Sequence, residues 1–226
     1  MVGKTIKYKT RSGEEFDGYL TKLGVDDPLP GIVIIPAIFG TDEDMIQLSD
    51  AWASDGFIVS VPDIFWRVLP GPTADHAVGR DRMGKFDLEQ GIDDIEDVIA
   101  DLKNRPECNG KVGMLGFCFG GRYVHLSAAR LGIDAGAAFH GTAIGKNLDE
   151  TNKITCPMSL HFGDNDPVVP MEEVNEIKDS YAGKTNVEIV VYEGAGHSFS
   201  MPSNQGYDAD VAKASRDAAL VLFRSM

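Results

Sequence analysis

Short runs rich in β-branched residues alternate with longer amphipathic segments along most of this chain. Residues 31–35 and 111–115 form nearly continuous apolar runs, which are typical of parallel strands buried on both faces. Strands that alternate with helices indicate βαβ units, and these predict an α/β fold with a doubly wound, mostly parallel sheet. The predicted strands are residues 16–23, 31–36, 57–62, 111–116, 135–140, 158–163 and 187–192.

Five helices are predicted between these strands, at residues 41–54, 88–103, 120–131, 171–181 and 207–224. The clearest, 88–103, carries an apolar stripe with helical period, and Pro106 stops it. Residues 5–10 and 16–23 alternate more and predict an antiparallel hairpin at the edge of the sheet. Because neither a repeat nor a linker interrupts the pattern, we expect residues 1–226 to form a single domain. Its sheet should have about seven or eight strands, with helices on both faces.

The charge of the chain excludes several classes of protein. Lys and Arg number 21 against 35 Asp and Glu, so the net charge is −14. Such a field repels nucleic acid and anionic membrane surfaces. Neither a spanning apolar stretch nor an N-terminal signal is visible. The three cysteines have no CxxC spacing, and an odd number is not a disulfide framework. We therefore expect a cytoplasmic protein in a reducing compartment.

A cysteine at the centre of a glycine-flanked turn is the first chemical feature. Residues 116–120 read Gly-Phe-Cys-Phe-Gly, between a predicted strand and a predicted helix. So tight a turn brings the residues two before and two after its centre together, which favours glycine at both. The turn would expose the Cys118 thiol, and the helix N-terminus favours negative charge there. The pattern predicts a nucleophile; the alternative is a buried apolar cysteine. A phosphate-binding glycine loop is disfavoured, because GxxxxGK[ST] is absent.

An aspartate and a histidine follow two later strands. Asp166 precedes a Pro-Val-Val-Pro turn, which would fix its direction, and is favoured over Asp164 for that reason. The alternative is an Asx-turn, a common use of Asp before Pro. His197 comes after a Gly-Ala-Gly segment; alone it would suit a solvated surface residue equally well. The order nucleophile, acid, histidine, each at a strand exit, is that of the α/β-hydrolases.

On these motifs the chain resembles the dienelactone hydrolase (carboxymethylenebutenolidase-like) family of α/β-hydrolases over almost its whole length. The motifs are Ile38-Phe39-Gly40, Pro62-Asp63-Ile64-Phe65-Trp66-Arg67, Phe86-Asp87-Leu88-Glu89, the Cys118 turn, Gly163-x-x-Asp166-x-x-Val169-Pro170 and Gly196-His197-Ser198-Phe199. The resemblance implies an α/β-hydrolase fold in which Cys118 is the nucleophile, His197 the base and Asp166 its orienting acid.

These residue types imply hydrolysis of a small ester or lactone through a cysteine thioester. The backbone N–H groups of Phe119 and Ile38 are expected to form the oxyanion hole. No cofactor is needed, and the five histidines show no HxxxH pair, so no metal is expected. The expected partner is a small-molecule ester or lactone, bound by a monomer or small homo-oligomer.

The chain departs from the family at the positions that bind and activate dienelactone. The family's glutamate before Ile-Phe-Gly is Ala37 here, so Cys118 is expected to pair directly with His197 at rest. The family's arginine shortly after the histidine is absent. Arg80 and Arg82 lie near the position of a second arginine, although solvated loop charges explain them equally well. Without a full carboxylate clamp, a neutral ester or lactone is favoured over dienelactone.

Aromatic and sulfur side chains near these motifs are candidates for a substrate pocket, with plain core packing as the alternative for each. They are Phe39, Phe65, Trp66, Phe117, Phe199 and Met201. Two other functions stay open beside the hydrolase. One is a catalytically silent α/β-hydrolase that binds a small ligand, favoured only by Ala37. The other is a thiol redox sensor that uses Cys118, with no resolving cysteine close in sequence.

Overall fold

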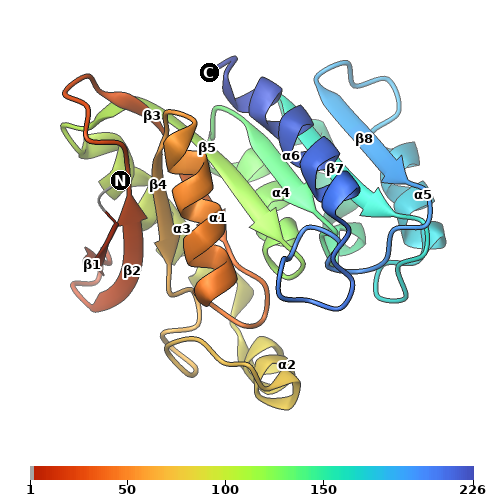
Figure 1. The fold of residues 1–226 in the computed structure, drawn as a ribbon, viewed down its shortest axis with the longest axis horizontal. Helices are drawn as coiled ribbons and strands as arrows, with labels where there is room; N and C mark the ends of the chain where they lie inside the picture. The colour runs from red at the N-terminus through yellow and green to blue at the C-terminus, as the bar shows by residue number, and fades with distance from the viewer. Residues whose placement is uncertain (1–2) are drawn as a thin grey trace. The chain divides into compact units, whose positions relative to one another are not determined.

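The computed structural model of the protein describes residues 3–226 (Figure 1). Contacts within the chain divide it into two compact units, Met1–Gly113 and Met114–Met226, and each is described by itself. The class is α/β with a mostly parallel sheet of eight strands, as the alternating pattern predicts. The single domain expected from the sequence stays a prediction. Among residues 3–226, no helix combines the length and the apolar character that crossing a membrane requires.

The first unit orders its strands β1-β2-β4-β3, with β5 next to β3. Their bounds are β1 (Lys4–Lys9), β2 (Glu15–Thr21), β3 (Leu29–Ile35), β4 (Ile58–Pro62) and β5 (Cys108–Phe117). Strands β1 and β2 form the expected antiparallel hairpin, β2 also pairs antiparallel with β4, and β3 and β4 are parallel. The helices are α1 (Glu43–Ser54), α2 (His76–Lys85) and α3 (Leu88–Asn104). In this unit α1 and α3 cover opposite faces of the strands (Figure 1).

The second unit begins within β5 and orders its strands β5-β6-β7-β8, all parallel. The remaining strands are β6 (Gly136–Phe139), β7 (Met158–Gly163) and β8 (Val187–Tyr192). Its helices are α4 (Gly120–Arg130), the 3₁₀ segment η1 (Ile144–Lys153), α5 (Met171–Ser180) and α6 (Ala209–Phe223). Here α6 and α4 cover opposite faces (Figure 1). The exits of β5, β6 and β7 therefore lie side by side at one edge, where chemistry is expected in α/β sheets.

Helix starts follow the rules of capping. Asp42, Asp87 and Asp208 precede α1, α3 and α6, and each accepts a hydrogen bond from a backbone N–H of the first turn. These bonds satisfy N–H groups that have no partner inside the helix, and the negative charge favours the helix N-terminus. The predicted strands and five predicted helices are all present, with ends within three residues of their predicted positions.

Two elements escape the sequence pattern, α2 and η1. Helix α2 contains Gly79 and Gly84, and few of its residues are buried. One buried residue is Arg82, whose guanidinium donates to the carbonyls of Ile38, Leu69 and Gly71. Tertiary hydrogen bonds, which leave no periodic signal, therefore hold this helix.

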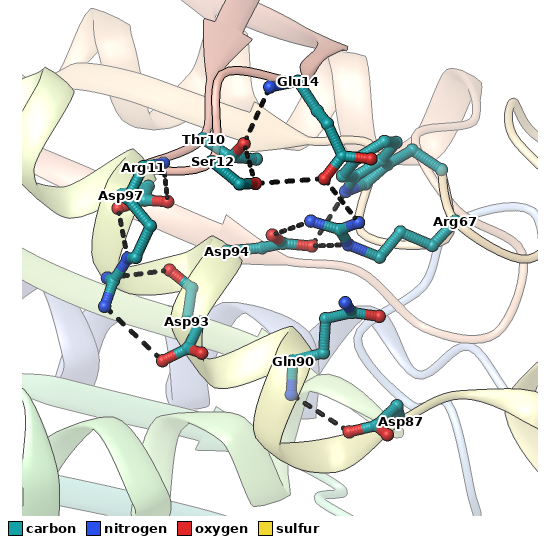
Figure 2. Close-up of polar contacts among 11 residues, drawn as sticks. Thr10, Arg11, Ser12, Glu14, Arg67, Asp87, Gln90, Asp93, Asp94 and Asp97 are labelled. Atoms are coloured by element: carbon teal, nitrogen blue, oxygen red, sulfur yellow. Dashed lines mark hydrogen bonds and ion pairs between the residues drawn. The ribbon is translucent and has the colours of Figure 1, made fainter.

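A charged network joins the β1–β2 hairpin of the first unit to α3 (Figure 2). The buried carboxylate of Asp94 accepts from Arg67 Nε and Nη2, both at 3.0 Å, and from Trp66 Nε1 at 2.9 Å. Arg67 also reaches Glu14. One residue earlier, Asp93 is exposed and lies 3.6 Å from Arg11. Two aspartates on one helix thus make ion pairs of very different burial.

We expect Asp94→Ala to lower the free energy of unfolding by about 1–3 kcal/mol, because it leaves a buried indole N–H and a half-buried guanidinium without their acceptor. The matched control Asp93→Ala should stay within about 0.5 kcal/mol, because exposed pairs contribute little. Urea unfolding of both variants measures the difference. Equal losses would show that the burial of Asp94 is unimportant.

Candidate active site

The turn that carries Cys118 is strained and depends on two glycines. Strand β5 ends at Phe117 and α4 begins at Gly120, so the strand passes into the helix within three residues. Cys118 has a φ of 50°, in the left-handed region that non-glycine residues rarely adopt. A Cβ added to Gly116 would lie 2.4 Å from the Gly120 carbonyl oxygen. Only glycine fits there, as the sequence predicts, and the turn leaves the Cys118 side chain half-buried.

Backbone hydrogen bonds from the end of β6 and the residues after it also hold this turn. The Cys118 N–H donates to the Phe139 carbonyl at 3.1 Å. The Cys118 carbonyl accepts from Thr142 at 2.9 Å and from Gly121 at 3.0 Å. Both peptide groups of the cysteine are thus hydrogen-bonded, which fixes the direction of its side chain.

Asp166 makes hydrogen bonds of both kinds that the sequence leaves open, one kind with each carboxylate oxygen. Oδ1 accepts from the backbone N–H groups of Val168 at 2.7 Å and Val169 at 3.1 Å, which makes the Asx-turn. Oδ2 accepts from His197 Nδ1 at 2.7 Å. Asp164 instead accepts from the Gly194 N–H and is exposed. Asp166 therefore contacts His197, and its role as the orienting acid stays a prediction.

His197 lies between Asp166 and Cys118 and hydrogen-bonds both. Burial lowers the pKa of its imidazole, but the bonds to Asp166 and Cys118 outweigh burial and raise the pKa from 6.5 to about 9. Because the pKa in the folded chain exceeds the ordinary value, this pair stabilises the fold below pH 6.5. That contribution is lost as the pH rises through about 9. The pairing of Cys118 with His197 in the resting enzyme, which Ala37 leads us to expect, stays a prediction that this hydrogen bond supports.

The other candidate residues are divided between the two units. In the first unit, Arg80 is exposed, Phe39 is half-buried against His76, and Arg82 is buried with its donors on backbone carbonyls. Two of these donors hold the Ile38 carbonyl, so Arg82 supports the loop that carries the second expected oxyanion donor.

Trp66 stacks on Phe16 and donates to Asp94, so packing accounts for it. In the second unit Phe199 and Met201 are buried. Phe119 directly precedes α4, at the end of the helix dipole that favours negative charge. Roles in substrate binding for this whole set stay predictions.

Two residues that the sequence does not single out lie at this site. His140, at the exit of β6, packs its ring against His197, with centroids 4.9 Å apart, and Ser200 hydrogen-bonds His140. Neither belongs to a motif, and their separation of 60 positions in the sequence hides their contact. Among residues 3–226, no group of three or more His, Cys, Asp and Glu side chains is arranged to hold a metal ion.

Solved structures identify the class of this fold. A dienelactone hydrolase-like promiscuous phosphotriesterase from metagenomic libraries matches with a TM-score of 0.86 and 24% identity, over 99% of this chain and 98% of its own. An esterase from Pyrococcus furiosus matches with a TM-score of 0.72 and 19% identity, over 95% and 91%. At such identities the likeness shows the fold, and the fold is that of the α/β-hydrolases.

Sequence comparison identifies the family. The model of the dienelactone hydrolase family matches residues 16–226. A carboxymethylenebutenolidase from Pseudomonas putida is 30% identical over 97% of this chain and 95% of its own. Carboxymethylenebutenolidase 1 of Cupriavidus pinatubonensis is 28% identical over 92% and 91%. The chain belongs to the dienelactone hydrolase family, which makes it a hydrolase of esters or lactones with a small-molecule substrate.

We expect His197 to titrate near pH 9 by NMR in the wild type, and Asp166→Asn to lower its pKa, because the neutral amide no longer stabilises the imidazolium. His161 is an internal control, since burial alone lowers its pKa to about 4 and the substitution leaves its surroundings unchanged. An unchanged His197 titration in Asp166→Asn would contradict the assigned contact.

Proposed function

We propose that this protein hydrolyses small carboxylic esters or lactones through a thioester on Cys118. The observation that carries the proposal is the line of hydrogen bonds from Asp166 through His197 to Cys118, with Nδ1 to Oδ2 at 2.7 Å. Nucleophilic catalysis requires such an arrangement, in which a base touches the nucleophile and a third group orients the base.

In the first half-reaction, the Cys118 thiolate attacks the carbonyl carbon and forms a C–S bond. The tetrahedral intermediate then expels the ester oxygen, and the His197 imidazolium gives that oxygen a proton. A pKa of about 9 keeps His197 protonated at neutral pH, so the proton is in place before the substrate arrives. An ester releases an alcohol, whereas a lactone opens and stays attached through the sulfur.

In the second half-reaction, the now neutral His197 takes a proton from water as the oxygen attacks the thioester carbon. Collapse of this intermediate breaks the C–S bond and releases the carboxylic acid. The sulfur takes the electron pair of the broken C–S bond, and His197 keeps the proton that it took from water. The net reaction converts one ester and one water into one acid and one alcohol, or one lactone and one water into one hydroxy acid. Asp166 holds the imidazole orientation through its hydrogen bond with Nδ1.

The oxyanion of both intermediates requires backbone donors, and we propose the Phe119 N–H as one of them. The Ile38 N–H, which belongs to the first unit, stays the sequence-based prediction for the second donor. Phe119 stands at the N-terminal end of α4, which favours negative charge. The Ile38 carbonyl is held by Arg82, which supports a fixed direction for this loop. Loss of one such donor typically lowers turnover by about 10²–10³.

A neutral substrate fits this chain better than dienelactone. The Arg82 guanidinium donates to backbone carbonyls, and Met201 occupies the position where the family has an arginine after the histidine. Arg80 is the remaining candidate to bind a substrate carboxylate. The net charge of −14 also opposes an anionic substrate. Thioesters belong to the same reaction class. The two alternative functions, a silent ligand-binding protein and a thiol sensor, are distinguished by the p-nitrophenyl acetate assay below.

We expect p-nitrophenyl acetate hydrolysis by the wild type, and its loss in Cys118→Ala and His197→Ala, because the first lacks the nucleophile and the second its acid and base. Cys156→Ala is the matched control and should keep full activity, since burial raises the pKa of that thiol to about 11. A silent binder would show no turnover in any form. A redox sensor would respond to an added oxidant in a way that requires Cys118, and it would not turn over the ester.

The substrate preference has its own test, a comparison of kcat/KM for a neutral aryl ester and for dienelactone on the wild-type enzyme. We expect the neutral ester to be at least about 10-fold better, because one missing charge-assisted contact is worth roughly 1.5–3 kcal/mol. Comparable values for the two substrates would overturn the preference and leave the reaction class standing.

A further inference from the structure

His140 occupies a strained position that the mechanism so far does not use. It follows β6 directly, has a φ of 41°, and its side chain is fully buried. A left-handed backbone at a non-glycine residue persists only where the surroundings over-determine it, and such residues gather at functional sites. The positive φ of His140 therefore needs a structural or functional explanation.

The backbone around His140 is fixed by two contacts. Its own N–H donates to the His161 carbonyl at 2.7 Å, which extends the β6–β7 pairing by one residue. Two residues later, Thr142 donates to the Cys118 carbonyl at 2.9 Å. His140 thus sits between the neighbouring strand and the peptide of the candidate nucleophile.

The His140 ring faces the loop that carries His197. The His140 and His197 ring centroids lie 4.9 Å apart, with their planes at 66°. Phe199 packs edge-on against the His140 ring, with the centroids 5.3 Å apart. Nε2 of His140 lies 2.9 Å from Ser200 Oγ. Nδ1 has no hydrogen-bond partner among residues 3–226, so Ser200 is the polar contact that holds the ring.

This contact matters because residues 193–208 form neither helix nor strand. On the N-terminal side of His197, the loop is tied to the β7 exit: Asp164 accepts from Gly194, and Asn165 donates to the Ala195 carbonyl at 3.0 Å. On the C-terminal side, Tyr192 of β8 and His140 pack against Phe199, and His140 also hydrogen-bonds Ser200. His197 therefore lies between the two segments of the loop that these contacts hold.

Charge is consistent with a supporting role. Burial lowers the pKa of His140 well below 6.5, and the nearby His197 lowers it further, so His140 is neutral beside the imidazolium. A second positive charge there would repel the first and weaken its pair with Asp166. The charged or titratable groups that contact the His197 ring are Asp166, Cys118 and His140.

We propose that His140 is a positioning residue, which acts through Ser200 and through ring contact to hold His197 in line with Asp166 and Cys118. The inference rests on the proposed function for its effect on turnover. It assigns no contact with substrate or with the reacting atoms to His140 itself.

The test uses His140→Phe, which keeps a ring against His197 but loses Nε2, and Ser200→Ala, which removes the partner hydroxyl. We expect each to lower kcat for p-nitrophenyl acetate about 10-fold or more with KM within about twofold, because a misplacement of about 1 Å can cost 10²-fold. The alkaline limb of kcat/KM should move to lower pH, because a displaced imidazole loses part of its bond to Asp166. The double variant should lose no more than the single variants, since both remove one contact.

Two further variants separate positioning from stability. His125→Phe is the matched control: His125 is also buried in the second unit and bonded to a hydroxyl, that of Tyr181 at 2.7 Å. It should lower the melting temperature and leave the alkaline limb in place. His140→Gln puts an amide nitrogen near the place of Nε2 and should restore part of the lost kcat.

The proposal is overturned if Ser200→Ala and His140→Phe keep kcat within twofold of the wild-type value and leave the alkaline limb of kcat/KM at the wild-type pH. It is also overturned if they lose activity as His125→Phe does, with the limb unmoved. Activity that survives in Cys118→Ala would overturn the proposed function instead. NMR titration of His197 in Ser200→Ala then still decides the positioning role, because a lowered pKa supports it and an unchanged pKa refutes it.

Discussion

The close approach of Gly116 to Gly120 is the constraint on which the site depends. Because a Cβ at Gly116 would lie 2.4 Å from the Gly120 carbonyl, the strand can pass into the helix here only without one. The turn so formed holds Cys118 at a φ of 50°, and hydrogen bonds from β6 and its exit fix both of its peptide groups. The same close packing recurs between Gly163 and Ala195, where an added Cβ would lie 2.1 Å from a carbonyl oxygen and where the loop of His197 passes the exit of β7.

Much of this arrangement can be predicted from the sequence, because its signals are local. Apolar runs place the strands, and the residues 116–120 and 163–170 carry glycines and prolines whose spacing reflects backbone geometry. Helices α2 and η1 give no such signal, since distant contacts hold them. Arg82 shows why: its partners Ile38 and Gly71 lie 44 and 11 residues away, and its burial opposes the usual reading of an arginine as a surface charge.

The pair of His140 and Ser200 was beyond sequence reasoning for the same reason. Neither residue lies in a motif, and they meet only because the exit of β6 and the loop after β8 come together in the second unit. Asp166 is the opposite case. An Asx-turn and an orienting acid are competing interpretations in a sequence, yet a carboxylate has two oxygens. Here one oxygen makes the Asx-turn, and the other accepts a hydrogen bond from His197.

The histidines of the second unit show what makes His197 different. His125, His140 and His161 are buried, and burial lowers the pKa of all three, so each is neutral near pH 7. His197 experiences the same lowering from burial, but Asp166 and Cys118 reverse its sign and raise the pKa to about 9. A positive charge is therefore confined to the imidazole that touches the thiol. Because His140 is uncharged, its ring can pack against the His197 imidazolium without repelling it. The charged imidazole can therefore be enclosed by a neighbouring histidine.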